Sequence, residues 1–468
     1  MKEIFAFTEI SAHLTRVARC LSIQPVISRF VLIVASVLVL APITFIRAQE
    51  VQAVTSVPSP GLPPGVAAAS NPAEATRAWL ASIPASEKIR SDAYFEGGYW
   101  LLLWNFLLTA AIMLFALLSG FSARIRDFAE RATHFRFLQA AIYAAAFVLV
   151  VAVLSFPLDY YQNFMREHQY GMATQDFAGW FFDWIKALIV QLIAFPILLM
   201  ALYFAFRRAA ERWWLVGAVV MMIFFVIAAI ISPVYVEPLF NKYTPLQNAR
   251  IRDSVLQLAR ANEIPVDKVF VVDASRQTKR VSANVSGLGS TTRIALNDNL
   301  LHQCSLPEIR QVMAHEMGHY VLNHIFKFFA FIALLALIAF ALAKLLFDWA
   351  VARWGDTWRV RGIADPAGWP LLVLIFSALA FLGTPVLNTL VRVQEREADA
   401  FGLNAAREPD AEAAVALKLG RYRKMEPTPL EEFIFFDHPS GRSRIRMAMD
   451  WKYAMLPART SELPARRE

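Results

Sequence analysis

Residues 314–324 read Ala-His-Glu-Met-Gly-His-Tyr-Val-Leu-Asn-His. His315 and His319 are four positions apart, so a helix would place both imidazoles on one face, one turn apart. Glu316 would lie beside this pair rather than within it. Two neutral imidazoles can hold a zinc ion, and a free carboxylate beside the ion can take a proton from the water that the ion activates. The stretch therefore predicts a metal site on one helix.

This His-Glu-x-x-His spacing is the signature of zinc metalloproteases. The alternative interpretation is a surface or core helix that carries two histidines by chance. Acidic residues further along the chain would complete a metal site, and they favour the metalloprotease.

The composition is that of a membrane protein. Hydrophobic residues make up 57% of the 468 residues, charged residues make up 18%, and the mean hydropathy is +0.43. Soluble domains are usually about 45–50% apolar and about 25% charged. In a membrane protein, the net charge of +8 bears first on the orientation of the spans and on contacts with anionic lipid headgroups. No basic run interleaves with aromatic residues, so nucleic acid is not expected as a partner. The two cysteines, Cys20 and Cys304, imply no disulfide framework.

Seven apolar segments predict membrane spans. The first, residues 30–46, is at the lower limit of length, and a cleavable signal peptide is its alternative. The stretch 49–84 is rich in Pro, Ala and Ser and predicts an exposed linker, and residues 79–98 predict a short amphipathic helix. The other six predicted spans are residues 99–121, 137–156, 185–206, 213–234, 325–347 and 369–390.

A polar stretch between the fifth and sixth spans predicts a small α+β unit. We expect a helix at 249–262, then strands at 268–272, 281–288 and 292–297. The motif helix is predicted over 306–324 and would run directly into the sixth span. That would place the metal site at the membrane boundary, where ionisable groups are costly and usually functional.

Residues 392–402, which follow the last span, carry candidate acidic ligands. Glu395 and Asp399 are four apart and would share a helical face, while Glu397 points elsewhere. Glu395 could ligate zinc, and Asp399 could accept the outer N–H of a ligating histidine. The alternative is a charged helix end leaving the bilayer, with Arg392 and Arg396 as interfacial anchors. Considered alone, this stretch favours the charged helix end. Considered together with His315 and His319, it favours the metal site.

From about residue 94 to residue 452 the chain resembles the zinc-dependent CAAX prenyl proteases, which are membrane-embedded gluzincin metallopeptidases with seven spans. The matching stretches occur in family order. They are YQNF at 161–164 with Gly171, PLFNKYTPL at 238–246, KVFVV at 268–272, RIALNDNLL at 293–301, the His-Glu-Met-Gly-His helix, Glu395-x-x-x-Asp399, and His438-Pro439.

This resemblance implies one zinc ion per chain, held by His315, His319 and Glu395. It implies that Glu316 is the general base and later the proton donor to the leaving amine. Asp399 would support a ligating histidine from behind.

The resemblance also implies residues for the substrate. His438 would aid the transition-state charge, and Arg444 falls on the arginine of the family's His-Pro-Pro-x-x-x-Arg motif, although Arg442 competes with it and Ser440 replaces the second proline. The strand after residue 281 would be a sheet edge onto which an extended peptide adds. Its candidate substrate-binding residues are Ser282, Ala283 and Asn284, where the family tends to have Asn-Ala in place of Ser282-Ala283.

The predicted fold is an all-α membrane protein whose seven transmembrane helices form a barrel around a water-filled chamber, with a small α+β zinc-protease portion at one end. We expect a multi-pass integral membrane protein, in the cell inner membrane if the host is bacterial. The predicted parts are 1–47 (tail and first span), 48–98 (linker), 99–235 (four spans), 236–324 (protease portion), 325–392 (two spans) and 393–468 (C-terminal helical segment).

The predicted function is that of a zinc metalloendopeptidase of the membrane. Its substrates would be peptides or proteins, possibly lipidated or anchored in the bilayer. The family acts on C-terminal Cys-aliphatic-aliphatic-any sequences that bear a prenyl group. The alternative is a seven-span protein that binds or transports metal without turnover. A carboxylate beside the ligands rather than among them, as Glu316 is, favours the enzyme.

Basic residues gather in the loops on one side of the predicted spans. The loop 158–178 on the zinc side holds only Arg166. The positive-inside rule would then place the zinc face outside the cytoplasm, whereas the resemblance places it in the cytosol, and both orientations stay open. The basic residues are Arg124, Arg126, Arg131, Arg136, Arg207, Arg208, Arg212, Lys344, Arg353, Arg359 and Arg361.

Overall fold

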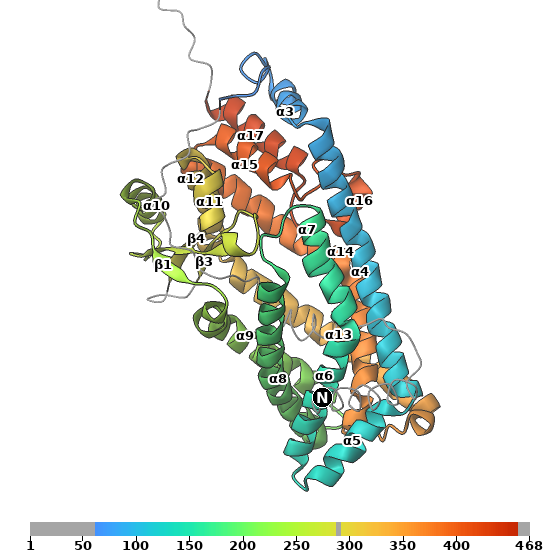
Figure 1. Cartoon of the computed structure of the whole chain (residues 1–468). Coiled ribbons are helices and arrows are strands. Elements are labelled where there is room, and N and C mark those ends of the chain that lie inside the picture. Colours follow the sequence, from blue (N-terminus) through green and yellow to red (C-terminus); the bar gives the residue numbers. More distant parts are fainter. Residues whose placement is uncertain (1–60, 287–291, 457–468) are drawn as a thin grey trace, which may run out of the picture.

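Six helical segments of the described residues are long and apolar enough to cross a membrane, and they coincide with the second to seventh predicted spans, except that the first segment ends at Leu118, before residue 121. The computed structural model describes residues 61–286 and 292–456, and the predicted first span at 30–46 lies outside them. Figure 1 shows an elongated bundle of these helices, with a small sheet on one flank and short helices gathered at one end.

Most of the long helices extend beyond the predicted spans. Several run on past the apolar stretch into polar sequence, because a helix satisfies its own backbone hydrogen bonds whether lipid or protein surrounds it. They are α4 (Ala85–Leu118), α6 (Arg136–Tyr160), α8 (Phe177–Arg208), α9 (Trp213–Ile231), α13 (His324–Trp358) and α14 (Trp369–Ala406). The exceptions are α4, which ends at Leu118, short of residue 121, and α9, which ends at Ile231 and continues as a π-helical turn, Ser232–Val236. The helix α6 continues through a π-helical turn, Tyr161–Met165, into α7 (Arg166–Gln169), and α5 (Phe121–Ala132) connects α4 to α6.

The predictions for residues 49–98 are partly wrong. Within the predicted linker, Pro72–Ala81 forms the helix α3, which Asn71 caps through its side chain. The predicted separate amphipathic helix does not exist, because residues 85–98 are the first turns of α4. The reason is tertiary: Trp79 of α3 is buried in a cluster with Ile445 and Met449.

The protease portion carries a four-stranded sheet in the order β1-β2-β4-β3. The strands are β1 (Tyr243–Pro245), β2 (Val269–Val272), β3 (Ala283–Ser286) and β4 (Arg293–Asn297), and the helices are α10 (Ala249–Ala261) and α11 (Asp298–Gln303). The pair β2–β4 is parallel, and β3–β4 is antiparallel. The predicted helix and strands are confirmed within a few residues, and β3 lies at an edge of the sheet.

The motif helix is shorter than predicted. It is α12 (Leu306–Val321), which begins at a capping box of Ser305 and Glu308. Asn323 adopts a left-handed conformation with φ 56°, a conformation that asparagine tolerates better than most residues. The prediction that the motif helix runs straight into a span is therefore wrong, and His324 begins the separate helix α13.

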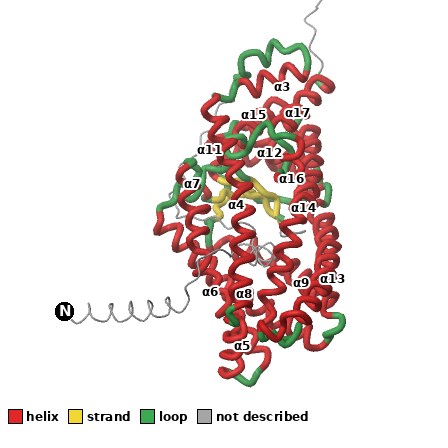
Figure 2. Tube along the Cα trace, turned by 90° about the vertical axis from the view of Figure 1, so that its right-hand side faces the viewer, coloured by secondary structure: helices red, strands yellow, loops and turns green. Residues whose placement is uncertain are grey.

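The helices α15 (Pro409–Leu419), α16 (Pro429–Phe435) and α17 (Gly441–Met455) lie with α3, α11 and α12 at one end of the bundle, and α5 lies at the other end (Figures 1 and 2). Both views place the sheet between these two ends. The metal-binding end and the α5 end are thus opposite poles of one bundle.

Two glycines allow α12 and α14 to lie in close contact. A Cβ atom at Gly402 would lie 3.1 Å from the backbone nitrogen of His315, and one at Gly318 would lie 3.2 Å from the Cα atom of Ala398. Both distances are tighter than ordinary packing contacts. The absence of these side chains brings the acidic segment of α14 to the face of α12 that carries the histidines.

Gly402→Ala should therefore force the two helices apart, because the obstructing atoms at His315 belong to the backbone. We expect the free energy of unfolding to fall by about 1–3 kcal/mol, measured as a lower unfolding temperature of the purified protein in detergent. Gly383→Ala is the matched control in the same helix, since no atom lies within 4 Å of its added Cβ. Equal unfolding temperatures for the two variants would contradict this account of the contact.

Candidate metal centre

Three side chains from two helices bring one ligand atom each to a common point. His315 and His319 come from α12 and Glu395 comes from α14, and their ligand atoms lie within 4.8 Å of one another. The two Nε2 atoms are 3.2 Å apart, and the Glu395 carboxylate lies 3.2 Å from Nε2 of His315 and 3.5 Å from Nε2 of His319.

These separations fit a tetrahedral metal ion. Ligand atoms bound at about 2.0–2.1 Å around a tetrahedral zinc stand about 3.3 Å from one another. The two Nε2 atoms, 3.2 Å apart, have that spacing, and each faces its own oxygen of the Glu395 carboxylate, Oε2 at 3.2 Å from His315 and Oε1 at 3.5 Å from His319, so the carboxylate lies within reach of an ion held by both histidines. Two imidazoles and one carboxylate are also the donor set of catalytic zinc sites that keep a position open for water.

A buried ionic network holds His315 from behind. Its Nδ1–H donates to Oδ1 of Asp399 over 2.8 Å, so Nε2, which faces Glu395, is the nitrogen that would bind a metal ion. Arg444 of α17 donates to the same carboxylate over 2.5 Å and lies 3.2 Å from Glu412 of α15. Asp399, Glu412 and Arg444 are all buried. This part of the structure fixes the tautomer and the orientation of His315.

A second relay holds His319, and the sequence analysis missed it. Nδ1 of His319 lies 2.9 Å from Nδ1 of His324, and Nε2 of His324 donates to Glu397 over 3.0 Å. Because a carboxylate only accepts, His324 carries its proton on Nε2 and accepts from Nδ1–H of His319. The lone pair of His319 Nε2 then faces the site. Lys327 also donates to Glu397, over 2.9 Å.

One signal for this relay was present in the sequence. His324 and Glu397 both stand close in sequence to the ligands, but helical spacing gave neither a role. Asn323 adopts a left-handed backbone conformation that separates α12 from α13, and His324, the next residue, lies beside His319. No periodicity of the motif helix predicts such a break.

The environment shifts the pKa values of the groups on α12. Burial raises the pKa of Glu316 to about 7, with the charges of His315 and Glu395 acting in opposite directions. Burial, aided by the neighbouring His315, lowers the pKa of His319 to about 4. Burial opposes protonation of His315, but Asp399 and Glu395 outweigh it and raise its pKa to about 10. A metal ion would displace that proton, as ligand binding to metals generally does.

The predicted substrate residues do not all lie together. His438 is at the centre, with Nε2 3.2 Å from Glu395 and Nδ1 2.8 Å from Asp437. Arg444 is buried behind His315, and its contacts are to Asp399 and Glu412. Arg442, the competing match, is exposed and lies 3.4 Å from Glu426. Of these two arginines, Arg444 is the one that contacts the ligand-supporting network.

The strand β3 offers an unpaired backbone edge. Asn297 donates its N–H to the carbonyl of Ser282, and Asn284 pairs with Ala295 of β4. Alternate residues of an antiparallel strand direct both backbone groups to the same side. The backbone groups of Ala283 and Val285 therefore point away from β4. Their side chains pack on the core of the protease portion, and Asn284 is exposed.

Two families match the chain in succession. The family described as "CAAX prenyl protease N-terminal, five membrane helices" matches residues 73–242, and the family described as "Peptidase family M48" matches residues 245–452. Together they span the bundle, the sheet and the metal-binding end.

Individual relatives agree with these matches. The chain is 31% identical over 336 residues to "Uncharacterized metalloprotease YhfN" of Bacillus subtilis, which covers 71% of this chain and 78% of that protein. It is 28% identical over 320 residues to "CAAX prenyl protease 1" of Saccharomyces cerevisiae, which covers 64% of this chain and 69% of that protein. The crystal structure of S. mikatae Ste24p has the same fold, with a TM-score of 0.65 at 24% identity over 79% of this chain and 89% of that chain.

His324→Ala should weaken metal binding, because His319 would lose the group that fixes its tautomer. Loss of such a supporting residue typically costs about 10–100-fold in metal affinity, measured here by competition for zinc with a chromophoric chelator. His302→Ala is the matched control, since His302 is exposed on α11. Unchanged zinc affinity in His324→Ala would show that the contact does not position His319.

Proposed function

The chain belongs to peptidase family M48 and is a metalloprotease of the membrane, and from this premise we propose that it is a zinc endopeptidase in which His315, His319 and Glu395 hold the metal ion and Glu316 is the general base. The observation that carries the proposal is the convergence of two imidazoles and one carboxylate on a common point, with a further carboxylate, that of Glu316, next to His315 in the sequence but not among the three. The alternative of a non-catalytic metal-binding or transporting protein finds no support in the family membership.

Zinc held at this site would supply a Lewis acid and lower the pKa of water. The residues of the chain would carry out the proton transfers and stabilise the developing charge. Glu316 takes the proton of the attacking water and returns it to the leaving amine. His438, oriented by Asp437, donates toward the oxygen on which negative charge develops. Asp399 and His324 keep the two ligating imidazoles in the tautomer with a free Nε2.

Arg444 would act through Asp399 rather than on the substrate. Its side chain is buried, and its guanidinium forms ion pairs with Asp399 and Glu412. Its contacts favour a positioning role over the predicted contact with substrate. Removing it would leave two buried carboxylates without their shared cation, a costly arrangement.

We propose that substrate adds to β3 as an extended strand. The backbone groups of Ala283 and Val285 are the ones directed to the open edge, so pairing would not depend on the substrate's side chains. The side chains of Ser282 and Asn284 are exposed and could contact the peptide. This mode suits an enzyme that accepts peptides of varied sequence.

The substrates would be peptides of membrane-associated proteins, with prenylated C-termini as the first class to test, since several relatives are named CAAX prenyl proteases. The proposal includes the enclosed, water-filled chamber of a seven-span barrel. The six described spans and the predicted span at 30–46 would form its wall.

Glu316→Gln should retain zinc but lose the general base. We expect turnover of peptides to fall by about 10²–10⁴-fold, measured with purified protein in lipid vesicles on prenylated and unprenylated peptides, at equal zinc content. Chelation of the wild type should abolish turnover, and added zinc should restore it. The control is Asp253→Asn, an exposed acid on α10. Equal turnover by the wild type and Glu316→Gln would remove Glu316 from the mechanism.

Ala283→Pro tests the edge strand. Proline removes an N–H that faces the open edge, and proline is tolerated there in a sheet. Loss of one backbone hydrogen bond to substrate should lower kcat/KM by about 10-fold, with zinc content and unfolding temperature unchanged. Asn284→Ala, which removes a side chain but no backbone N–H, should lower kcat/KM less than Ala283→Pro does. If both variants cut as the wild type does, substrate does not pair with β3.

A further inference from the structure

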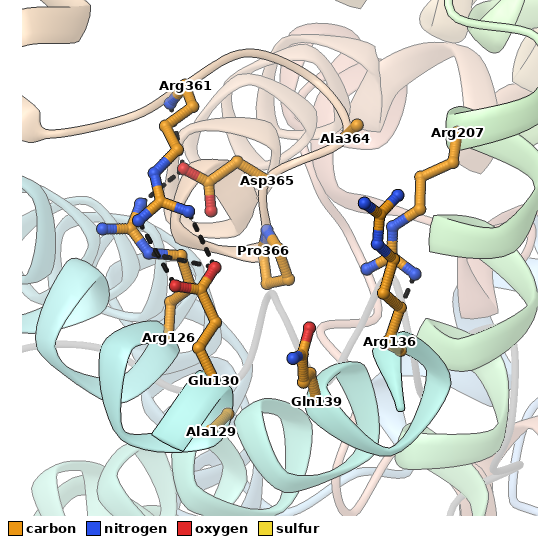
Figure 3. A pocket seen from close by; sticks show the side chains of 10 residues that line it. All are labelled: Arg126, Ala129, Glu130, Arg136, Gln139, Arg207, Arg361, Ala364, Asp365 and Pro366. Atoms are coloured by element: carbon orange, nitrogen blue, oxygen red, sulfur yellow. Dashed lines mark hydrogen bonds and ion pairs between the residues drawn. The ribbon is translucent and has the colours of Figure 1, made fainter. Parts of the chain in front are cut away.

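A pocket of about 260 Å³ lies at the α5 end of the bundle, between α5, α6, α8 and the loop that precedes α14 (Figure 3). This volume is far larger than the share of one water molecule, about 30 Å³ in the liquid. Four arginines from four parts of the chain line the pocket: Arg126, Arg136, Arg207 and Arg361.

The charges on one wall are compensated. Arg126 pairs with Asp365 over 2.6 Å, and Arg361 pairs with Glu130 over 2.7 Å. Asp365 also accepts hydrogen bonds from the backbone N–H groups of Arg361 and Ala367. The carboxylates of this wall are therefore already engaged, and Arg126, which is buried, is part of the structure that shapes the pocket.

The charges on the other wall are not compensated. Figure 3 shows the side chains of Arg136 and Arg207 together, across the pocket from Glu130 and Arg361. Arg207 donates to the backbone carbonyl of Arg136 over 3.2 Å, which holds the two residues side by side. Within the residues that the structure describes, neither guanidinium forms an ion pair with a carboxylate. The pocket thus has two like charges that an anion would neutralise together.

These arginines lie at the ends of candidate membrane spans. Arg136 is the first residue of α6, and Arg207 is next to the last residue of α8, both of which are candidate spans. Large apolar side chains beside them face outward: Phe137 on α6 is 52% exposed, and Phe204 on α8 is 58% exposed. A ligand in the pocket could therefore present its charge to the arginines and its hydrocarbon to these helices.

We propose that this pocket binds an anionic phosphate group, either that of a phospholipid headgroup whose acyl chains lie along α6 and α8, or free inorganic phosphate. Guanidinium groups bind phosphate oxygens in a bidentate manner. Basic pockets between transmembrane helices are a known way to hold anionic headgroups. The site is separate from the metal centre, at the opposite pole of the bundle, and the proposal does not depend on the proposed function.

The test measures lipid binding to the detergent-solubilised protein by native mass spectrometry. Phosphatidylglycerol and phosphatidylcholine are titrated separately, and inorganic phosphate is added in a second arm. We expect one phosphatidylglycerol per chain, bound at least 10-fold more tightly than phosphatidylcholine. Arg136→Gln/Arg207→Gln should lower that affinity at least 10-fold. Arg124→Gln/Arg212→Gln is the matched control, because both of its arginines are exposed outside the pocket.

The arms distinguish the two sources of phosphate. Saturable binding of inorganic phosphate that the Gln pair removes, without a preference for phosphatidylglycerol, supports the site with free phosphate as its ligand. If the pocket pair and the control pair lose equal affinity for phosphatidylglycerol, the proposal is overturned, because the lipid would then be attracted by the general positive charge of this end of the protein. No preference for phosphatidylglycerol and no binding of phosphate would overturn it as well.

A charge-conserving pair keeps the test decisive if the Gln pair does not fold. Arg136→Lys/Arg207→Lys retains both charges but loses the bidentate geometry. We expect it to unfold at the temperature of the wild type and to bind phosphatidylglycerol measurably more weakly, by less than 10-fold. A folded Lys pair that has lost all preference for phosphatidylglycerol over phosphatidylcholine would also contradict the proposal.

Discussion

The close contact between α12 and α14 is the constraint on which the metal centre depends. Gly318 and Gly402 leave no Cβ atoms between the two helices, so the backbone of one lies against the other. Only at this distance does Glu395 reach the two histidines. The glycines are therefore as much a part of the site as its ligands, because a carboxylate held a helix-diameter further away would ligate nothing. A long helix such as α14 can serve as both membrane span and ligand donor because it runs on past its apolar stretch.

Each of the two candidate ligating imidazoles, those of His315 and His319, is held by a different set of hydrogen bonds. His315 depends on a buried network in which Arg444 of α17 joins Asp399 and Glu412. Burying these charges is costly unless all partners are present, so the C-terminal helices cannot be separated from the metal centre. His319 depends on His324 and on the half-exposed Glu397. The network that holds His315 is buried, whereas the hydrogen-bonded chain that begins at His319 ends at the protein surface, where Glu397 also contacts Lys327. The site thus draws on α12, α13, α14, α15 and α17.

The charges of the molecule are divided between the two ends of the bundle. Around His315 the charged groups Asp399, Glu412 and Arg444 are buried and paired with one another. At the α5 end arginines gather at the ends of the candidate spans, and among the described residues Arg136 and Arg207 of the pocket form no ion pair with a carboxylate. On the long helices between the ends, large apolar side chains such as Val153 and Leu382 are exposed, with exposed fractions of 69% and 74%. That exposure is expected where the surroundings are lipid rather than water. The protein therefore presents different chemistry to each face of the bilayer.

The sequence by itself determined the features that depend on neighbours along the chain. Helical spacing predicted that His315 and His319 share a face, apolar length predicted the six described spans, and turn and strand signals predicted β2, β3 and β4. Spacing also placed Glu395 and Asp399 on one helix face. It did not by itself distinguish a metal site from a charged helix end, and only the presence of His315 and His319 elsewhere in the chain favoured the metal site. The end of α12 at Val321, the role of His324, the packing of α3 on α17 and the burial of Arg444 were not predictable. Each of these is decided by contacts between segments far apart in the sequence, or by one left-handed residue, Asn323, that redirects the chain. Local geometry fixes which side chains share a helix face, but only the packing of one helix against another decides which faces meet.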